Sequence, residues 1–432
     1  MNDISRNLSS TSLNDEPIEN AKMGKMEFPK LSTKKTHPLV LPCYDNRDNG
    51  TGKDLQAKVF RQNTRHSNGG WKFIDEPELK KQRGVCWELV KSVGNSIIEG
   101  KELTNTTLPI SLFEPRSFLE KLSDTWGYSP IYLNQAANCK DPLERFKLVI
   151  AFTISGLHLT QTLTKPFNPL LGETFEGSFS DGSNAFCEQT SHHPPISHWE
   201  VVDQENRFKF YGYANFSARC LGNVVKGNQK GPLTIEFEDG TKITWTFPEV
   251  LIKGIFWGDR VTEFSGKITF TDEKNKLGCD VLFNPNALGF VKSLFSKQKE
   301  PSDVIQGTIY KLESSLSSSN GVSSKKSSSS NSNNNSNTIC KIEGSWLTEL
   351  IIDNIVYWNI KMQPSGIIYK ENPLPTDCRY REDLKYLKEG NIEKAKEFKE
   401  LIEDKQRSEA KIRKEGIKKD SKSKKDKNNL LL

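Results

Sequence analysis

The sequence predicts a mainly β protein in which a large antiparallel sheet is flanked by helices. From about Leu171 to Met362, short segments rich in Val, Ile, Thr, Phe, Tyr and Trp alternate between apolar and polar residues. Gly, Asp and Asn separate these segments, and no helical periodicity interrupts the series, which favours antiparallel pairing of successive strands. Closure into a barrel would remove the exposed edges of such a sheet, so we expect a barrel.

The N-terminal region has two parts of different character. Residues 1–70 are rich in Asn, Asp, Ser, Lys and Thr without apolar periodicity, so we expect a disordered arm there. From Trp71 onward apolar residues become frequent, and Trp87, Val90 and Ile97 fall near one face of a helix. The sequence therefore predicts that the folded domain begins near Trp71.

Another helix is predicted to begin after Asp141. This residue is a favourable N-cap, Pro142 occupies the first helical position, and Glu144 lies in the first turn. The residues from Phe146 to Ile154 are apolar on most sides, which indicates a largely buried helix.

Two features are expected inside the strand region. Residues 238–241 separate two alternating segments and predict a hairpin turn. Residues 314–337 are mostly Ser, Asn and Lys and predict a disordered insertion, because such a tract cannot offset its ordering entropy. The insertion is either a linker between domains or a loop within one sheet. We favour the loop, because only about 25 residues of strand character follow it.

The C-terminal region is predicted to be helical. A helix over residues 379–389 ends at Gly390, and a highly charged helix follows from Asn391 to about Glu415. Residues 416–432 hold six Lys and two Asp and predict a disordered, lysine-rich tail.

Composition argues against several classes of protein. The 432 residues are 34% apolar with a mean hydropathy of −0.62, so part of the chain is expected to carry no core. Most of the net charge of +6 lies in the tail, which argues against a nucleic-acid partner. No secretory signal or membrane-spanning segment is visible, and the eight cysteines include no CxxC pair. These features predict a soluble cytoplasmic protein.

The densest cluster of candidate functional residues lies at residues 188–198, where His192 and His193 precede two prolines. A zinc site is one interpretation, but neighbouring side chains on a strand point to opposite faces and no second ligand cluster exists. A serine hydrolase using Ser191 is another, but the nucleophile turn that it needs is missing. A third is that the histidines only end a polar strand. The stiff double proline favours a preorganised anion-binding edge.

Two further groups of residues have chemistry that suits a phosphate. In the segment 165–173, two prolines fix the backbone around Asn168, and Lys165 offers a point charge. The alternative is a helix-to-strand connector with a surface lysine. On the terminal helix, Lys399, Glu403 and Arg407 share one face, with a drift of about 40° per step. The alternative here is a row of solvated ion pairs.

These residues carry a resemblance to the oxysterol-binding protein family. The string EQTSHHPP at 188–195 is similar to the family's signature, and KPFNPLLGE at 165–173 is similar to a second family block. Similarity continues through LPISLFEPRSFLEKL, PTDCRYREDLKYLKEGN and KELIEDKQR, and covers about residues 71–415. The sequence departs from the family pattern at His198, where a small residue is usual, and in the missing aromatic-rich C-terminal segment.

The resemblance implies a lipid-transfer domain over residues 71–415: an incomplete antiparallel barrel around an apolar tunnel, with an N-terminal lid and C-terminal helices. Family members extract a lipid such as a sterol or phosphatidylserine and exchange it for phosphatidylinositol 4-phosphate. The lid corresponds to residues 86–104, with Trp87, Val90 and Ile97 among its apolar residues. The implied headgroup-binding residues are Lys165, Phe167, Asn168, His192, His193, Lys399, Glu403 and Arg407.

The resemblance implies a carrier that makes or breaks no bond, so neither catalytic residues nor a cofactor nor a metal is expected. The protein is expected to be a monomer that binds anionic membrane surfaces transiently, at the periphery of intracellular membranes. An enzyme acting on phosphoinositides is the first alternative, but the CxxxxxR loop of phosphatases and the glycine loop of kinases are missing. A phosphoinositide-gated sensor or scaffold without net transfer is the second, and the second lipid is left open.

Overall fold

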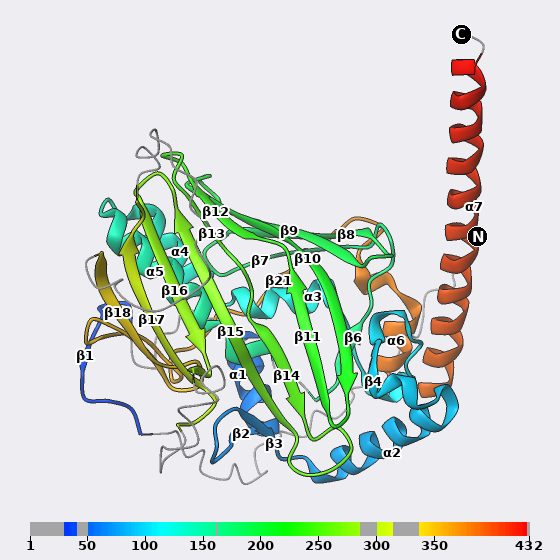
Figure 1. Cartoon of the computed structure of the whole chain (residues 1–432), viewed down its shortest axis with the longest axis horizontal. Helices are drawn as coiled ribbons and strands as arrows, with labels where there is room; N and C mark the ends of the chain where they lie inside the picture. The colour runs from blue at the N-terminus through cyan, green and yellow to red at the C-terminus, as the bar shows by residue number, and fades with distance from the viewer. Residues whose placement is uncertain (1–29, 41–50, 161–162, 286–299, 314–336, 430–432) are drawn as a thin grey trace, which may run out of the picture. The chain divides into compact units, whose positions relative to one another are not determined.

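A 19-stranded sheet forms the main layer of the protein (Figure 1). The computed structural model describes residues 30–40, 51–160, 163–285, 300–313 and 337–429, and residues 31–432 belong to one compact unit. The strands of this sheet are β1 (Lys35–Thr36), β2 (Asn63–Arg65), β3 (Trp71–Phe73), β4 (Glu99–Glu102), β7 (Thr174–Ser178), β8 (Asn184–Ser191), β9 (Ile196–Val202), β10 (Phe208–Leu221), β11 (Val224–Lys230), β12 (Leu233–Phe237), β13 (Lys242–Trp245), β14 (Glu249–Lys253), β15 (Val261–Asp272), β16 (Leu277–Phe283), β17 (Val304–Lys311), β18 (Thr338–Ser345), β19 (Glu349–Ile352), β20 (Ile355–Asn359) and β21 (Ile368–Tyr369).

Helices and a small second sheet complete the fold. Strands β5 (Phe113–Ser117) and β6 (Lys165–Phe167) pair in parallel and form the second sheet. The α-helices are α1 (Thr51–Gln62), α2 (Glu76–Val93), α3 (Phe118–Leu122), α4 (Ser129–Asn138), α5 (Pro142–Ser155), α6 (Glu382–Lys388) and α7 (Ile392–Asn429). Among the helices of the described residues, none is long and apolar enough to cross a bilayer.

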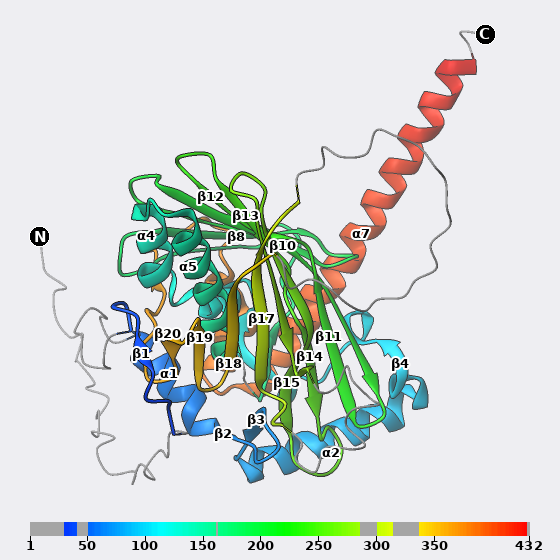
Figure 2. The same ribbon diagram turned by 60° about the vertical axis from the view of Figure 1, so that its left-hand side comes forward.

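Successive strands of the main sheet pair mostly with their neighbours in sequence. Strands β7 to β10 form one antiparallel run, and β15 to β20 form another. Figure 2 shows β17, β18, β19 and β20 of the second run side by side. Among the described strands, no pairing joins β20 to β7, so the barrel is incomplete. The predicted fold class, a large antiparallel sheet with flanking helices, is confirmed.

The two runs are joined by a fork. Residues 208–212 of β10 pair with β12, which leads through β13 to the end of β15. Residues 215–221 of β10 pair instead with β11, which leads through β14 to the start of β15. The two branches leave β10 and rejoin at β15, so each of these long strands belongs to two ribbons.

The alternating pattern in the sequence corresponds to burial in the sheet. In β9, Ser197, Trp199 and Val201 are buried while the residues between them are more exposed, as the two-residue period of a strand requires. The predicted hairpin at 238–241 joins β12 to β13, and Gly240 there has φ of 77°, which favours glycine.

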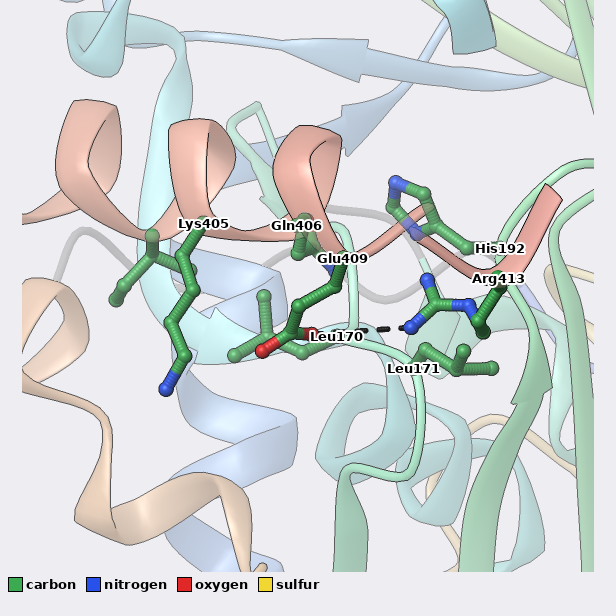
Figure 3. A pocket seen from close by; sticks show the side chains of 8 residues that line it. Leu170, Leu171, His192, Lys405, Gln406, Glu409 and Arg413 are labelled. Carbon is green, nitrogen blue, oxygen red and sulfur yellow. Dashed lines mark ion pairs between the residues drawn. The ribbon is translucent and has the colours of Figure 1, made fainter. Parts of the chain in front are cut away.

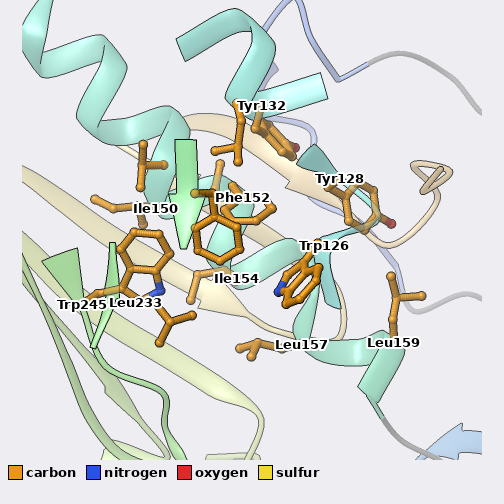
Figure 4. Packing of buried hydrophobic residues seen from close by; sticks show 14 of the residues in the cluster. Trp126, Tyr128, Tyr132, Ile150, Phe152, Ile154, Leu157, Leu159, Leu233 and Trp245 are labelled. Atoms are coloured by element: carbon orange, nitrogen blue, oxygen red, sulfur yellow. The ribbon is translucent and has the colours of Figure 1, made fainter. Parts of the chain in front are cut away.

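Aromatic and aliphatic side chains together fill the core between the sheet and helices α4 and α5 (Figure 4). Trp245 stacks with Phe210 and Phe270 at ring-centroid distances of 5.7 and 5.6 Å. Phe152 of α5 meets Phe210 edge-on at 5.3 Å. Helix α5 begins as predicted, because the side chain of Asp141 accepts a hydrogen bond from the Leu143 amide.

The prediction of a disordered arm is wrong for residues 30–40, where β1 pairs with β20, and for residues 51–70. Helix α1 and strand β2 lie there, Val59 is buried in the main core, and Leu55 and Phe60 pack against it. The side-chain amide of Gln56 donates to the carbonyl oxygens of Ile360 and Met362 at 3.2 and 2.9 Å. A polar helix with so few apolar residues leaves little periodicity to detect. The rest of the predicted arm includes residues 1–29 and 41–50, which lie outside the described residues.

The strands around the predicted insertion pair directly with each other. In β17 and β18, Ile309 lies opposite Cys340 and Gly307 opposite Ile342. This pairing supports a loop within one sheet over a linker between domains. Residues 314–336 themselves lie outside the described residues, so their predicted disorder stays a prediction.

The predicted end of the charged C-terminal helix is wrong. Helix α6 does end before Gly390, whose φ is 78°, but α7 continues through Gly416 to Asn429. A single interior glycine costs about 1 kcal/mol relative to alanine, and the surrounding Lys and Glu are good helix formers. The residues predicted as a disordered tail are therefore helical as far as residue 429.

Candidate functional site

Three segments that are distant in sequence meet beside the small parallel sheet. Strand β6 places Lys165 opposite Phe113 of β5, and α7 brings Lys399 to the same ring. The ammonium nitrogen of Lys165 lies 4.1 Å from the centre of the Phe113 ring, and that of Lys399 lies 5.6 Å from it. Both distances suit cation–π attraction, which holds two like charges near one aromatic ring.

This crowding of cations changes the acidity of Lys165. Burial lowers the pKa of Lys165 to about 7, and the positive charges of Lys399 and Arg381 act in the same direction. The carboxylate of Glu403 partly offsets this shift. An added anion would relieve the repulsion among these cations. The cluster is therefore electrostatically prepared for a negatively charged ligand.

The structure brings two of the three predicted residues of α7 into this cluster. Lys399 donates to Glu403 at 2.6 Å, and only 8% of its side chain is exposed. Arg407 has 62% of its side chain exposed, lies 3.8 Å from Glu403 and donates to Asp404. Arg407 thus points away from Lys399 in this conformation, because the drift of successive i+4 steps turns it aside, and its place in the site stays a prediction.

The histidine pair lies on the turn between β8 and β9. The rings of His192 and His193 are 4.5 Å apart, with His193 exposed and His192 half-buried. The expectation that their side chains diverge is wrong, because the strand ends at Ser191 and residues 192–195 form a turn. Burial, and next the neighbouring His193, lower the pKa of His192, while the Pro169 backbone opposes the shift.

The other two residues of the predicted headgroup set are Asn168 and Phe167. The exposed Asn168 accepts a hydrogen bond from the ammonium of Lys165 at 2.9 Å. Phe167 is only 1% exposed and packs on Phe113 with ring centroids 4.7 Å apart. Its side chain therefore supports the Phe113 platform from within the core.

A buried arginine that the sequence analysis missed holds this platform in place. Arg381 donates to Glu173 at 2.8 Å, to Asp383 at 2.7 Å and to the backbone carbonyl of Asn168 at 3.0 Å. Burial alone would lower the pKa of Arg381, but the two carboxylates raise it above its usual value. It lies in the segment predicted as a helix over residues 379–389, but no local pattern marks this arginine as buried.

The predicted lid residues lie at the ends of β11 and β14, where α2 crosses (Figure 1). Val90 and Ile97 are buried in a cluster with Phe256, and Trp87 packs on Phe256 at 4.7 Å while staying 42% exposed. Trp87, Val90 and Ile97 were predicted to lie near one face of a helix, but only Trp87 and Val90 lie on α2. Helix α2 stops at Gly94, so Ile97 lies in the 3₁₀ turn that follows.

Neither of the catalytic interpretations gains support from this geometry. In the described part of the chain, no three His, Cys, Asp or Glu side chains are grouped as they would be around a metal ion. The hydroxyl of Ser191 donates to the Pro194 carbonyl at 2.7 Å. His198 instead faces Thr190, with its Nδ1 2.8 Å from the Thr190 hydroxyl.

The chain belongs to the oxysterol-binding protein family, whose model matches residues 89–425. It is 59% identical over 379 residues to oxysterol-binding protein 9 of Dictyostelium discoideum, an alignment that covers 87% of each chain. It is 30% identical over 415 residues to oxysterol-binding protein-related protein 1 of Homo sapiens, covering 85% of this chain and 41% of that one. The chain therefore spans less than half the length of this human relative.

Solved structures share the fold. The Osh3 ORD of Saccharomyces cerevisiae, in complex with PI(4)P, superposes with a TM-score of 0.58 at 23% identity, covering 76% of this chain and 84% of that one. The Osh1 ORD domain in complex with cholesterol gives a TM-score of 0.60 at 22% identity, covering 86% and 89%. At these identities the likeness concerns the fold alone.

Proposed function

We propose that this protein binds phosphatidylinositol 4-phosphate and exchanges it for a second lipid, a sterol or another membrane lipid, between membranes. The observation that carries the proposal is the pair of ammonium groups of Lys165 and Lys399 on one Phe113 ring. The two histidines add donors on the neighbouring turn, and His192 interacts electrostatically with Glu403. The proposed headgroup-binding residues are Lys165, Phe167, Asn168, His192, His193, Lys399, Glu403 and Arg407.

The chemistry of the headgroup matches this set of side chains. A phosphomonoester carries a charge of about −1.5 to −2 near neutral pH and needs several cations or donors at once. Lys165 and Lys399 supply charge, and the imidazoles supply ring nitrogens that donate or accept. Glu403 orients Lys399 and accepts hydrogen bonds from inositol hydroxyls. Arg407 would join the site by turning away from Asp404.

Relatives support the lipid assignment. The Osh3 ORD structure is a complex with PI(4)P, and the Osh1 ORD structures are complexes with cholesterol and with ergosterol. By analogy, the acyl chains or the sterol would lie in an apolar tunnel inside the incomplete barrel, with residues 86–104 as the lid. The protein then acts as a cytoplasmic carrier without catalysis, as a monomer that visits anionic intracellular membranes. Its lipid-transfer domain would begin before residue 71, because α1 packs on the core.

The test is extraction of phosphatidylinositol 4-phosphate from vesicles by the double variant His192→Ala/His193→Ala. We expect a loss of about tenfold or more, because two donors next to the phosphate disappear. The melting temperature should stay near that of the wild type, because neither ring is fully buried. His198→Ala is the matched control, since this exposed imidazole lies on β9, the strand that follows the histidine turn, and its Nδ1 contacts the Thr190 hydroxyl.

Two outcomes would contradict the proposal. Undiminished extraction by a stably folded double variant would remove the histidines from the headgroup site. Stoichiometric binding without movement of labelled lipid between two vesicle populations would identify a sensor or scaffold, and would overturn the exchange step.

A further inference from the structure

The N-terminal strap, residues 31–40, covers one edge of the main sheet. Its strand β1 pairs in parallel with β20, where residues 35–36 lie opposite residues 355–356, and Figure 2 shows the two strands side by side. The amide of His37 donates to the Val356 carbonyl oxygen at 2.8 Å. None of the described residues that line the cavity between α7 and the turn after β8 belongs to the strap (Figure 3). The strap therefore contributes no side chain to that cavity or to the proposed headgroup residues.

Without the strap, β20 would be the last strand of its antiparallel run. On one side β20 pairs with β19, and among the described strands only β1 pairs with its other side. The backbone N–H and C=O groups along a free edge are open to a strand from another chain. Covering these groups is therefore the structural role of β1.

Strand β20 itself has none of the features that commonly protect an edge. Its sequence is IVYWN, which contains no charged residue and no proline, and the preceding strand β19 is mostly apolar. Edge strands avoid pairing with other chains by being short, by carrying charges such as lysine, or by containing proline. The strap supplies all three features, because β1 is two residues long, includes Lys35, follows Lys34 and is soon followed by Pro38. The strap thus replaces an unprotected edge with a protected one.

Part of the strap is held by acidic side chains of the sheet. The Ser32 amide donates to Glu349 Oε1 at 3.0 Å, and the Lys34 ammonium forms an ion pair with Glu343. More than half of the Glu343 side chain is exposed, so water and salt screen this pair and it contributes little to stability. These contacts guide the strap onto the edge but hold it weakly.

His37 anchors the strap next to helix α5. Its Nε2 lies 3.1 Å from Glu144 Oε1, and its ring stacks on Tyr357 of β20 with centroids 4.8 Å apart. The Leu39 amide donates to His37 Nδ1 at 3.3 Å, which leaves the proton of the neutral imidazole on Nε2, next to Glu144. The Tyr357 hydroxyl donates to the other oxygen of Glu144 at 2.9 Å, so this carboxylate joins the strap to β20.

The strap can open without unfolding the domain. Its apolar residues Leu31, Leu39 and Val40 are only partly buried against the core. A segment with few buried contacts opens locally at a free-energy cost well below that of global unfolding. Strand β20 would stay paired with β19 when this happens, so an ordered apolar edge would be uncovered.

We infer that the strap keeps the protein monomeric, and that a copy whose strap is released associates with a second copy through the free edge of β20. Two identical edges related by a two-fold axis run antiparallel, which is the pairing that β19 and β20 already use. A second copy is the fitting partner because it presents the same uncharged strand, IVYWN, in the same ordered conformation. The inference goes beyond the proposed function and does not depend on the lipid that is bound.

The test compares two full-length variants of the strap by sedimentation velocity. The release variant, Lys34→Glu/His37→Glu, places carboxylates against Glu343 and Glu144, so the strap should detach. The matched control, Thr33→Glu/Lys35→Glu, changes the formal charge equally, with histidine counted as neutral, at two exposed positions of the same strap. We expect the release variant to self-associate at least about tenfold more strongly than the control, because two attractive contacts become repulsive. The control should remain a monomer, like the wild type.

A second comparison identifies the edge that pairs. Ile355→Lys, added to the release variant, places a lysine on β20 and should restore the monomer, because a charge on an edge strand opposes pairing. Ile412→Lys adds the same charge at an exposed position of α7 and should leave the association unchanged. A synthetic peptide of residues 31–40 should also return the release variant to the monomer, because it occupies the edge from outside.

Three results would overturn the inference. The first is a release variant that stays monomeric, and the second is self-association that Ile355→Lys leaves unchanged. The third is a wild type that associates as strongly as the release variant, since the strap would then guard nothing. If the release variant loses its cooperative melting transition, Lys34→Glu alone gives the same comparison with a smaller perturbation, and the same results decide.

Discussion

Lys165 shows how a single residue is made sensitive to its ligand. Its ammonium lies on the Phe113 ring, near Lys399, and its pKa falls to about 7 because of burial and the neighbouring cations. At neutral pH roughly half of the molecules therefore lack this charge until an anion arrives. Anion binding and proton uptake at Lys165 are then linked.

This linkage predicts a pH dependence of extraction. Lys165 is fully charged below about pH 6 and mostly neutral above about pH 8, so extraction of phosphatidylinositol 4-phosphate should weaken as pH rises through 7. The second ionisation of the phosphate, near pH 6, acts in the opposite direction and is largely complete by pH 7. Lys165→Arg keeps its charge throughout and should flatten the profile above pH 7. An equally steep profile for both proteins would exclude Lys165 as the titrating group.

Arg381 illustrates a residue whose role is to position others. It bridges Glu173 and Asp383, and Arg381→Met would leave two buried carboxylates without their partner. We expect a loss of about 3–5 kcal/mol in the free energy of unfolding, measured by denaturant. Arg219→Met, which removes an exposed pair with Glu102, should cost less than about 1 kcal/mol. Adding Glu173→Gln and Asp383→Asn to Arg381→Met should recover part of the loss. Without any recovery, packing of the arginine would explain its contribution.

At the scale of elements, α7 differs most from what its sequence predicts. The helical repeat of α7 places Lys399 and Glu403 in the cluster around Phe113. Each step of four residues adds a rotation of about 40°, which turns Arg407 away from this cluster. Sequence periodicity specifies which residues share a stripe, yet only packing against the core decides which stripe faces inward. For α7 that direction is marked by Ala395 and Lys399, which are both buried.

The lysine-rich end of α7 provides a test at this scale. Residues 416–432 contribute six Lys and two Asp, so their deletion should weaken binding to anionic vesicles. Each lysine near such a surface contributes up to about 1 kcal/mol, and the effect should fade with salt as the Debye length shrinks below about 10 Å. Affinity for soluble inositol 1,4-bisphosphate should not change. Vesicle binding that is unaltered at low salt would show that other residues mediate docking.

For the molecule as a whole, much of the fold was predictable and the site only partly so. Alternation along strands such as β9 and the cap of α5 are local signals, and both elements form where expected. The polar helix α1 escaped prediction because it is stabilised by contacts with residues about 300 positions away, through Gln56. The Phe113 platform was missed for the same reason, since nothing near Phe113 in sequence marks it as the support of two lysines.

The fork between β10 and β15 predicts unequal protection within the sheet. Strand β12 is almost entirely buried, whereas β11 and β14 consist of partly exposed residues with one exposed lysine at the end of each. Amide hydrogen exchange should be faster in β11 and β14 than in β12 and β13, because their hydrogen bonds lie closer to solvent. Uniform exchange across both branches would mean that the sheet opens as one unit.

Seen mechanically, the fork divides the sheet into a stiff arm and a compliant arm. The stiff arm, β12 and β13, is anchored by Trp245 in the aromatic core. The compliant arm, β11 and β14, ends where α2 packs through Val90 and Trp87. A displacement of α2 would therefore bend β11 and β14, while β10, β12, β13 and β15 stay in place. The turn Ile110–Leu112, which leads directly into Phe113, contacts both α2 and α7, so a displacement of α2 would also reach the Phe113 platform.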